Sequence, residues 1–505
     1  MQEREGKAEG NQISRGYLAK WKNADYRARL VHTTWLFLSF ISMGFIAGQR
    51  GPTFLDLQLI TNTDVEEASL FFTFAAVGGL LGALVIGASY DRFNKPRLIF
   101  LANIGMGVCV GVVPQCRQYP LMIFIWFITG FCMRGLETSG TADVVRVWKS
   151  ESRPYMFIVH LGFSIGALIS PMVTEPFLVP KHLVEKQNSD IKSEDTAITC
   201  NITNNASLTS NNSCINNQTD LFQSPPYVVK LQYAFIISAI LAVLTSLPFL
   251  IKSFMDKSNL AKGGNSRKAA EQRNVPLLYY VISIVLIMCM YICNTGIEDA
   301  FSAFLMTFAV KQMEWSKKDG ALVTSAFWAS LITARIFVIF VADLISPAKL
   351  LLFAMCFVII ALIGLWTSAL YLAHTGIWVF VCVAGSAISI LFPTGISLTD
   401  KELIPVNGKV SSFILVAGAI GLLSNPVILG FFIKEFSALW FCYLLLSEAI
   451  MSVVLLFLIL IYGRKILKSV RKRTVVEIEI DSEHGAQDTL MDDLKNGTVE
   501  GLGVV

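Results

Sequence analysis

The sequence predicts an all-α membrane protein with twelve transmembrane helices. Hydrophobic residues make up 54% of the 505 residues, charged residues make up only 15%, and the mean hydropathy is +0.59. A soluble domain carries about 25% charged residues, so this composition excludes an ordinary soluble fold. The apolar residues also gather in runs of roughly 18–25, long enough for an α-helix to cross about 30 Å of hydrocarbon.

The apolar runs occur twelve times along the chain. They cover residues 31–52, 69–90, 98–116, 119–142, 155–178, 227–251, 276–299, 319–343, 348–370, 375–396, 410–433 and 438–462. Glycine and proline inside these runs are compatible with helix, because membrane helices tolerate both residues.

A basic stretch divides the runs into two groups of six. We therefore expect a segment 1–30, a six-helix bundle 31–251, a linker 252–275, a second six-helix bundle 276–462 and a tail 463–505. From residue 474 the tail is polar and acidic, which is typical of disorder.

Positive charges favour one end of the predicted helices. Lys and Arg are frequent in 1–30, in 252–275, after residue 462 and in the turns after the second and fourth runs, whereas the opposite turns carry few. The positive-inside rule then places both termini and the linker in the cytoplasm. We interpret the basic stretches as orientation signals and expect no nucleic-acid partner. The polar first 30 residues do not resemble a cleavable signal peptide.

Residues 179–226 form one long polar loop on the side opposite the termini. The loop contains four glycosylation sequons, which start at Asn201, Asn205, Asn211 and Asn217. Sequons are used only on the lumenal side, so they agree with the charge asymmetry and favour a glycoprotein of the plasma membrane. Cys200 and Cys214 lie in the same loop, where an oxidising compartment permits a disulfide between them. Two free thiols are the alternative.

Two sequence matches indicate that the two groups of helices are related. Gly166–Pro171 in the fifth run resembles Gly421–Pro426 in the eleventh, at an offset of 255 residues. Asp91 after the second run matches Asp343 after the eighth, at an offset of 252 residues. Nearly equal offsets in equivalent helices are typical of a duplicated architecture.

The turn after the second run carries the most specific motif. Segment Gly87–Arg97 reads GASYDRFNKPR and resembles the signature of the major facilitator superfamily, with Asn94 where that family has Gly. Asn tolerates the left-handed backbone that we expect this turn to need. The resemblance implies the major facilitator fold, in which two six-helix bundles form the transmembrane unit.

The same turn provides the candidate gating residues. Asp91, Arg92 and Arg97 are expected to pair across the seam between the two bundles, closing one face and releasing it in the other state. Asp143, near the cytoplasmic end of the fourth run, is the expected partner of this basic turn. Alternatively, the bases only fix the topology.

A narrower resemblance covers most of residues 30–462. Segments similar to the fucose–proton symporter family are Gly135–Thr138, Ser164–Ala167 and Ser389–Leu398, and Gly51–Leu57 resembles its vertebrate sodium-dependent glucose transporter branch. The resemblance implies uptake of glucose or a related monosaccharide coupled to sodium or protons, with no cofactor. The acid of the family's fourth helix, part of its proton and sugar site, falls on Glu137.

The charges of the fourth run point to a central polar site independently of the family. Arg134 and Glu137 are three residues apart, so they share a helix face and can pair. Charged groups in the bilayer core cost several kcal/mol unless they face the bundle interior. Thr141 lies one turn further along this face, and His160 approaches from the fifth run. A purely structural ion pair is the alternative.

The second half offers fewer candidates for substrate or ion binding. Asn294 and Glu298 are four residues apart and, with Asp299, are expected to end the seventh helix. We interpret them as part of an outer gate or of an ion site. The alternative is that they are only a solvated helix end. Asn425 lies mid-span before a proline, where its amide is expected to bind a sugar hydroxyl.

Trp328 in the eighth run is a candidate platform for sugar stacking, as are Trp35 in the first run and Trp126 in the fourth. Arg335, also in the eighth run, is expected to extend toward the cytoplasmic interface, with contact to the substrate as the alternative. The chain has no GxxxxGK[ST], HExxH or GxSxG motif, so we expect neither an enzyme nor an ATP-driven pump. The expected partners are a sugar, a coupling cation and the lipid bilayer, with the protein acting as a monomer.

Two other functions fit these residues. The same fold serves many solutes, so the cargo is alternatively a nucleoside, a carboxylate or a drug, and Arg134 would then pair with an anion. A protein that binds sugar without moving it, and signals through its tail, is the alternative of another class.

Overall fold

The computed structural model describes residues 23–90, 92–180, 226–255, 277–341, 344–406 and 408–467, and every regular element within them is helical. Twelve of these helices are long and apolar enough to cross a membrane. The predicted fold class is therefore confirmed.

The first six helices, here called the N-half, are α2 (Ala24–Thr61), α3 (Val65–Ser89), α4 (Lys95–Val112), α5 (Tyr119–Trp148), α6 (Ser152–Thr174) and α8 (Pro226–Met255). The last six, the C-half, are α9 (Leu277–Gln312), α10 (Lys317–Val341), α11 (Pro347–Leu370), α12 (His374–Leu398), α13 (Gly408–Glu435) and α14 (Trp440–Ile461). Short 3-10 or π segments extend several of them, at Val113–Gln115, Lys149–Glu151, Glu175–Phe177, Thr399–Leu403 and Tyr462–Leu467.

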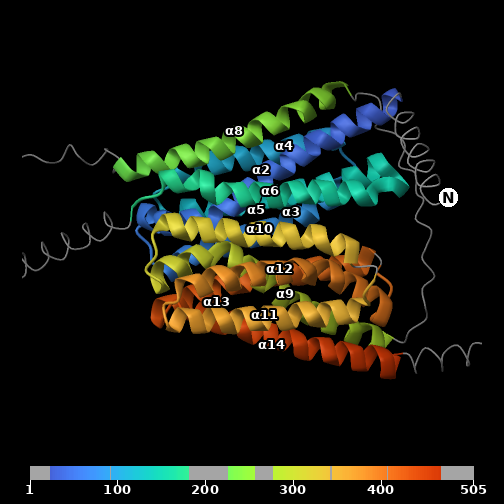
Figure 1. The fold of residues 1–505 in the computed structure, drawn as a ribbon. Helices are drawn as coiled ribbons and strands as arrows, with labels where there is room; N and C mark the ends of the chain where they lie inside the picture. The colour runs from blue at the N-terminus through green and yellow to red at the C-terminus, as the bar shows by residue number, and fades with distance from the viewer. Residues whose placement is uncertain are drawn as a thin grey trace, which may run out of the picture.

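The helices lie roughly antiparallel to their neighbours in sequence, so the molecule has two ends (Figure 1). We call the end at which α2 begins the Ala24 end, and the end at which it finishes the Thr61 end. Both α2 and α14 have their outer termini at the Ala24 end (Figure 1).

The two halves repeat one packing pattern. In the N-half α2 packs on α6, α3 on α5, and α4 on α8; in the C-half the equivalent pairs are α9 with α13, α10 with α12, and α11 with α14. The halves meet where α2 packs on α9, α3 on α13, and α6 on α10 (Figure 1). This pseudo-symmetric arrangement is typical of a duplicated six-helix unit.

Local capping explains where α3 and α4 begin. Asp64 accepts a hydrogen bond of 2.9 Å from the Glu67 N–H, and together these two residues form a capping box that starts α3. Asn94 accepts one of 3.2 Å from the Arg97 N–H and so caps α4. Asn94 has φ −62°, so the expected left-handed backbone at this position was wrong: it is a helix cap that the turn requires there.

Helix α9 is longer than the sequence predicted. We expected it to end at residue 299, but it continues to Gln312 through a largely apolar segment. Asn294, Glu298 and Asp299 therefore lie inside the helix, and the hypothesis of a solvated helix end was wrong. Charged residues usually mark the end of a span, but these are accommodated within the protein.

Glycines allow close approach of α3 and α5. A Cβ atom on Gly78 or Gly82 would lie 1.9 Å or 2.1 Å from the carbonyl oxygen of Phe127 or Phe131. From the other side, a Cβ on Gly130 would lie 1.9 Å from the carbonyl oxygen of Ala75. Small residues at membrane helix interfaces let backbones approach in this way.

Gly82→Ala is expected to destabilise the N-half by about 1–3 kcal/mol, because the added methyl group meets backbone that cannot move independently. Thermal unfolding in detergent measures the effect. Gly87→Ala is the matched control on the same helix, since the nearest atom to its added Cβ is a methyl carbon of Thr138 at 3.5 Å. Equal melting temperatures for the two variants would contradict this packing.

Candidate substrate site

A cavity of about 3060 Å³ separates the two halves. It is lined at the Ala24 end by residues of helix termini and turns, among them Tyr90, Arg97 and Pro347. It finishes at Arg50 and Ser302, well before the Thr61 end. The cavity is therefore open at the Ala24 end and closed at the Thr61 end.

Ion pairs between the halves hold the Thr61 end closed. Asp56 of α2 pairs with Lys317 of α10, and the two side chains are only 1% and 8% exposed. The carboxylate of Asp56 also accepts a hydrogen bond of 2.8 Å from the backbone N–H of Val179, just after α6. Arg50 of α2 pairs with Asp299 of α9 at 3.0 Å, directly at the closed end of the cavity.

A more exposed ion pair lies further out at the same end. Lys434 of α13 contacts Asp64 at 2.9 Å and Glu66 at 2.7 Å, both at the start of α3. Partial burial acts to raise the pKa of Asp64, but hydrogen bonds from the Glu67 N–H and Lys434 hold it below its usual value. This contact adds to the closure from the solvent side.

Aromatic rings complete the barrier behind Arg50. Phe54 packs against Phe72 and Phe304 with ring centroids 5.1 Å and 5.3 Å apart, so the cluster joins both halves. The guanidinium of Arg50 lies 5.7 Å from the Phe72 ring centroid. All three rings are fully or almost fully buried, so they exclude water between the cavity and the Thr61 end.

The structure brings together the four N-half candidates from the sequence on the cavity wall. Arg134 donates a hydrogen bond of 2.6 Å to Glu137, and both remain partly exposed to the cavity. Thr141 and His160 line the same cavity. The His160 ring packs on Phe40 with ring centroids 5.4 Å apart, on the wall that also carries Glu137.

The C-half contributes Glu298, Asp299, Trp328 and Arg335 to the wall. Arg335 was expected to extend toward the membrane interface, but it faces the cavity, where its charge interacts with that of Glu298. Glu298 makes no hydrogen bond or ion pair with the described residues.

The charges of the inner cavity balance. Three arginines, Arg50, Arg134 and Arg335, face three acids, Glu137, Glu298 and Asp299. Arg134 pairs with Glu137 and Arg50 pairs with Asp299, whereas Glu298 is only near an arginine. A site with no net charge suits a neutral solute, because a charged one would be left uncompensated in a low-dielectric interior.

Several buried donors around this charge cluster have no partner. The indole nitrogens of Trp126 and Trp328, the hydroxyl of Ser302 and Nε of Arg335 line the cavity without a hydrogen bond to the described residues. Leaving a buried donor unsatisfied costs about 1–3 kcal/mol. In this state the four atoms are buried within the cavity wall, so a movement of their side chains or helices is needed before they can donate to oxygen atoms of a bound solute or of water.

Two sequence candidates do not line the cavity. Asn425 donates a hydrogen bond of 3.1 Å to Glu448, and Asn294 accepts one of 2.9 Å from Ser452. Both partners lie on α14, on the far side of α9 and α13 from the cavity. The expectation that Asn425 binds a sugar hydroxyl was wrong, because its side chain packs between Gly296 and Glu448.

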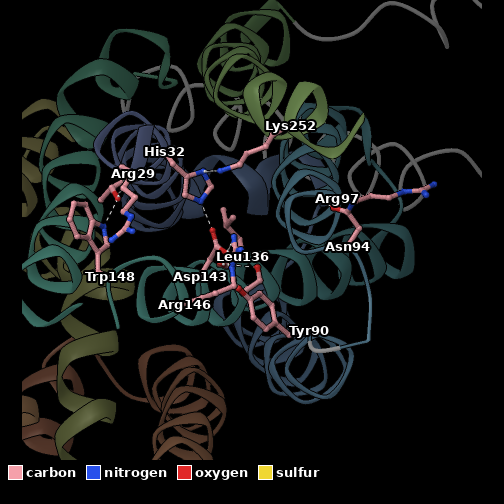
Figure 2. A network of polar contacts seen from close by, with 12 residues as sticks. Arg29, His32, Tyr90, Asn94, Arg97, Leu136, Asp143, Arg146, Trp148 and Lys252 are labelled. Carbon is pink, nitrogen blue, oxygen red and sulfur yellow. Dashed lines mark hydrogen bonds and ion pairs between the residues drawn. The ribbon is translucent and has the colours of Figure 1, made fainter. Parts of the chain in front are cut away.

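Asp143 is held by a network within its own half, which includes Tyr90 at the start of the turn after α3. It accepts hydrogen bonds from Tyr90 at 2.8 Å and Arg146 at 2.7 Å, and it also contacts His32, whose other nitrogen lies 3.0 Å from Lys252 (Figure 2). Burial and the neighbouring charge of Asp143 raise the pKa of the Tyr90 hydroxyl far above its usual value.

Arg92 and Arg97 are exposed at the mouth of the cavity, and Arg97 points away from Asp143 (Figure 2). The turn therefore contacts Asp143 through Tyr90, whereas the expected pairing with its bases Arg92 and Arg97 was wrong in this state, because Arg146 and His32 occupy the rest of the carboxylate. Asp91 lies outside the described residues, as do Cys200, Cys214 and the sequons at Asn201, Asn205, Asn211 and Asn217.

Sequence reasoning missed Lys317, Ser302 and Glu448. Lys317 looks like an ordinary interface residue at the start of a span, and its partner Asp56 is 261 positions away. Glu448 had a detectable signal, since an acid inside an apolar run is costly and requires a partner.

Comparison with known proteins agrees with this architecture. The model of the Major Facilitator Superfamily matches residues 33–179 and 226–426. Sodium-dependent glucose transporter 1 of Homo sapiens is 23% identical over 397 residues, which is 78% of this chain and 71% of that protein. Major facilitator superfamily domain-containing protein 4A of Danio rerio is 21% identical over 459 residues, 80% of this chain and 83% of that protein.

Solved transporters share the fold. A D-xylose–proton symporter superposes with a TM-score of 0.61 at 11% identity, covering 84% of this chain and 96% of that one. A nucleoside transporter superposes with a TM-score of 0.58 at 12% identity, covering 85% and 98%. The family match, the twelve helices and the central cavity lead to one assignment: this chain belongs to the Major Facilitator Superfamily and is a transporter rather than an enzyme.

Proposed function

We propose that this protein takes up glucose or a related monosaccharide by alternating access, coupled to the entry of sodium or protons. The observation that carries the proposal is the set of unpartnered donors beside the balanced charges of the inner cavity. A sugar is uncharged and presents several hydroxyl oxygens, which accept from such donors and donate to carboxylates. The names of the relatives that are sodium-dependent glucose transporters support the same cargo.

Glu298 is the proposed site of the coupling cation. The other two inner acids are held by Arg134 and Arg50, whereas Glu298 has no ion-pair partner among the described residues. Binding a proton or sodium ion there would remove the one loosely compensated negative charge of the cavity. No cofactor is needed for this cycle.

The proposed orientation follows from the positive charges. The Ala24 end would face the cytoplasm, and the glycosylated loop 179–226 would face the outside of a plasma-membrane monomer. In that orientation the present structure is open to the cytoplasm, and the Asp56–Lys317 and Arg50–Asp299 pairs form the closed outer gate.

Counterflow tests the proposal. Purified protein in liposomes preloaded with unlabelled glucose is expected to take up labelled glucose transiently and saturably, and unlabelled hexoses outside should compete. Competition by nucleosides, carboxylates or drugs but not by hexoses would replace the substrate while keeping the transport mechanism. Saturable glucose binding without counterflow would favour the non-transporting sensor.

Trp328→Phe is expected to raise the KM for glucose about five- to tenfold, because it keeps the ring but removes an N–H that we assign to a sugar oxygen. Initial rates of counterflow measure this. Trp366→Phe is the matched control, since the Trp366 indole donates to Tyr443 at 3.3 Å and does not line the cavity. An unchanged KM in Trp328→Phe would remove Trp328 from the site.

A further inference from the structure

A second cavity lies outside the central one, on the C-half between α10, α11 and α12. Its volume is about 710 Å³, and Lys349 is the one charged residue among the described residues that line it. Phe337 and Phe353, on its walls, are 66% and 57% exposed, so the cavity is an apolar groove on the surface that faces the bilayer.

The groove runs inward from the Ala24 end along α11. Lys349 lies in the first turn of that helix, and Phe357, two turns further on, also lines the groove. Eight residues of α-helix span about 12 Å, which is the length of a substantial part of one acyl chain. The groove therefore has a basic group at the level of the helix ends and apolar walls below it.

The N-terminus of α11 adds a second feature for an anion. Ser346 occupies the N-cap position but makes no side-chain capping hydrogen bond, unlike Asn94 at the equivalent helix α4. The first N–H groups of a helix have no partner within it and carry partial positive charge. Lys349 is exposed and makes no hydrogen bond or ion pair with the described residues.

We propose that this groove is a binding site for one anionic glycerophospholipid. The phosphate would contact Lys349 and the first turn of α11, and an acyl chain would lie along α11 between α10 and α12. A phosphate at a helix N-terminus is a favourable arrangement, and an anionic headgroup complements the lysine. The apolar walls require the chain, so a lipid rather than a soluble phosphate fits the whole site.

The groove also adjoins the transport pathway. Val338 and Leu350 line both the groove and the central cavity, near the mouth at the Ala24 end. Helices α10 and α11 therefore form the wall between the groove and the cavity, and the bound lipid packs on the side of this wall that faces away from the cavity.

Native mass spectrometry of the full chain tests the site. With phosphatidylglycerol added, the protein is expected to retain one lipid, and Lys349→Glu should weaken that binding about tenfold or more, since the charge is reversed. Lys465→Glu, the same change at the same end but away from the groove, should bind as the unaltered protein does. Ala334→Trp, which fills the groove without changing charge, should also weaken binding.

Two comparisons of lipid retention decide the test: one between ligands, and one between variants whose melting temperature equals that of the unaltered protein and which are therefore folded. Weaker retention of phosphatidylcholine and no retention of glycerol phosphate would support the proposal. Equal retention of phosphatidylcholine and phosphatidylglycerol, equal retention of glycerol phosphate, or unaltered binding in Lys349→Glu and Lys349→Gln would overturn it.

Discussion

Replacing Asp56 with Asn is expected to shift the protein from the present state toward one that is open at the Thr61 end. Asp56 and Lys317 come from different halves and are almost fully buried. Removing one partner of a buried ion pair leaves the other charge uncompensated, at a cost of about 3–5 kcal/mol. The ratio of the two states should therefore change by about 10²–10⁴-fold.

Distances between spin labels at Gln118→Cys and Glu435→Cys measure this shift, because both positions are exposed at the Thr61 end, one in each half. The native cysteines are replaced by serine for the experiment. Asp56→Asn should populate a longer distance than the parent. The double variant Asp56→Asn with Lys317→Met should recover part of the parent distribution, since it removes the unpaired lysine as well.

Lys434→Met is the matched control for the gate. Its ion pairs with Asp64 and Glu66 also join the halves, but the lysine is 36% exposed. Water and salt screen exposed ion pairs and weaken them, so this variant should change the distance distribution little. A shift as large as that of Asp56→Asn would show that burial does not set the strength of this gate.

Glu298→Gln is expected to abolish the dependence of uptake on the coupling cation while leaving glucose exchange intact. Coupling between two ligands usually corresponds to about 1–3 kcal/mol, or a stimulation of about 5–150-fold. Without the carboxylate the cation has no site at Glu298, so this stimulation should fall to about onefold. Uptake with and without the ion gradient, compared with counterflow in the same vesicles, separates the two effects.

Glu448→Gln is the matched control for coupling. Glu448 is another acid that lies inside a span without an ion-pair partner among the described residues, but it faces Asn425 rather than the cavity. This variant should keep the ion dependence. Loss of coupling in Glu448→Gln and its retention in Glu298→Gln would move the cation site to α14 and contradict our assignment.

The parts of this protein that follow from local sequence were predictable. Apolar runs identify helices because crossing the bilayer requires a fixed length of apolar residues. The contact between Arg134 and Glu137 follows from helix geometry alone, because residues three apart lie on one face. The Gly87–Arg97 segment indicated the superfamily because all the residues of this motif lie in one short turn, where their spacing along the sequence can be read directly.

The parts that depend on how helices face one another were not predictable. Asn294 and Glu298 are one turn apart, yet one binds Ser452 and the other lines the cavity, because α9 is packed on all sides. Asn425 was assigned to the sugar for its position in a span, but the rotation of α13 directs it to Glu448. The Asp56–Lys317 gate joins two helices that no local pattern connects.

Accumulation of labelled glucose in liposomes tests the central claim most directly. The purified protein is reconstituted and given an inward sodium gradient, an inward proton gradient or neither. The account predicts saturable accumulation above the external concentration with at least one gradient and only equilibration without any. Absence of glucose flux under all three conditions, or equilibration that neither gradient changes, would contradict cation-coupled sugar uptake.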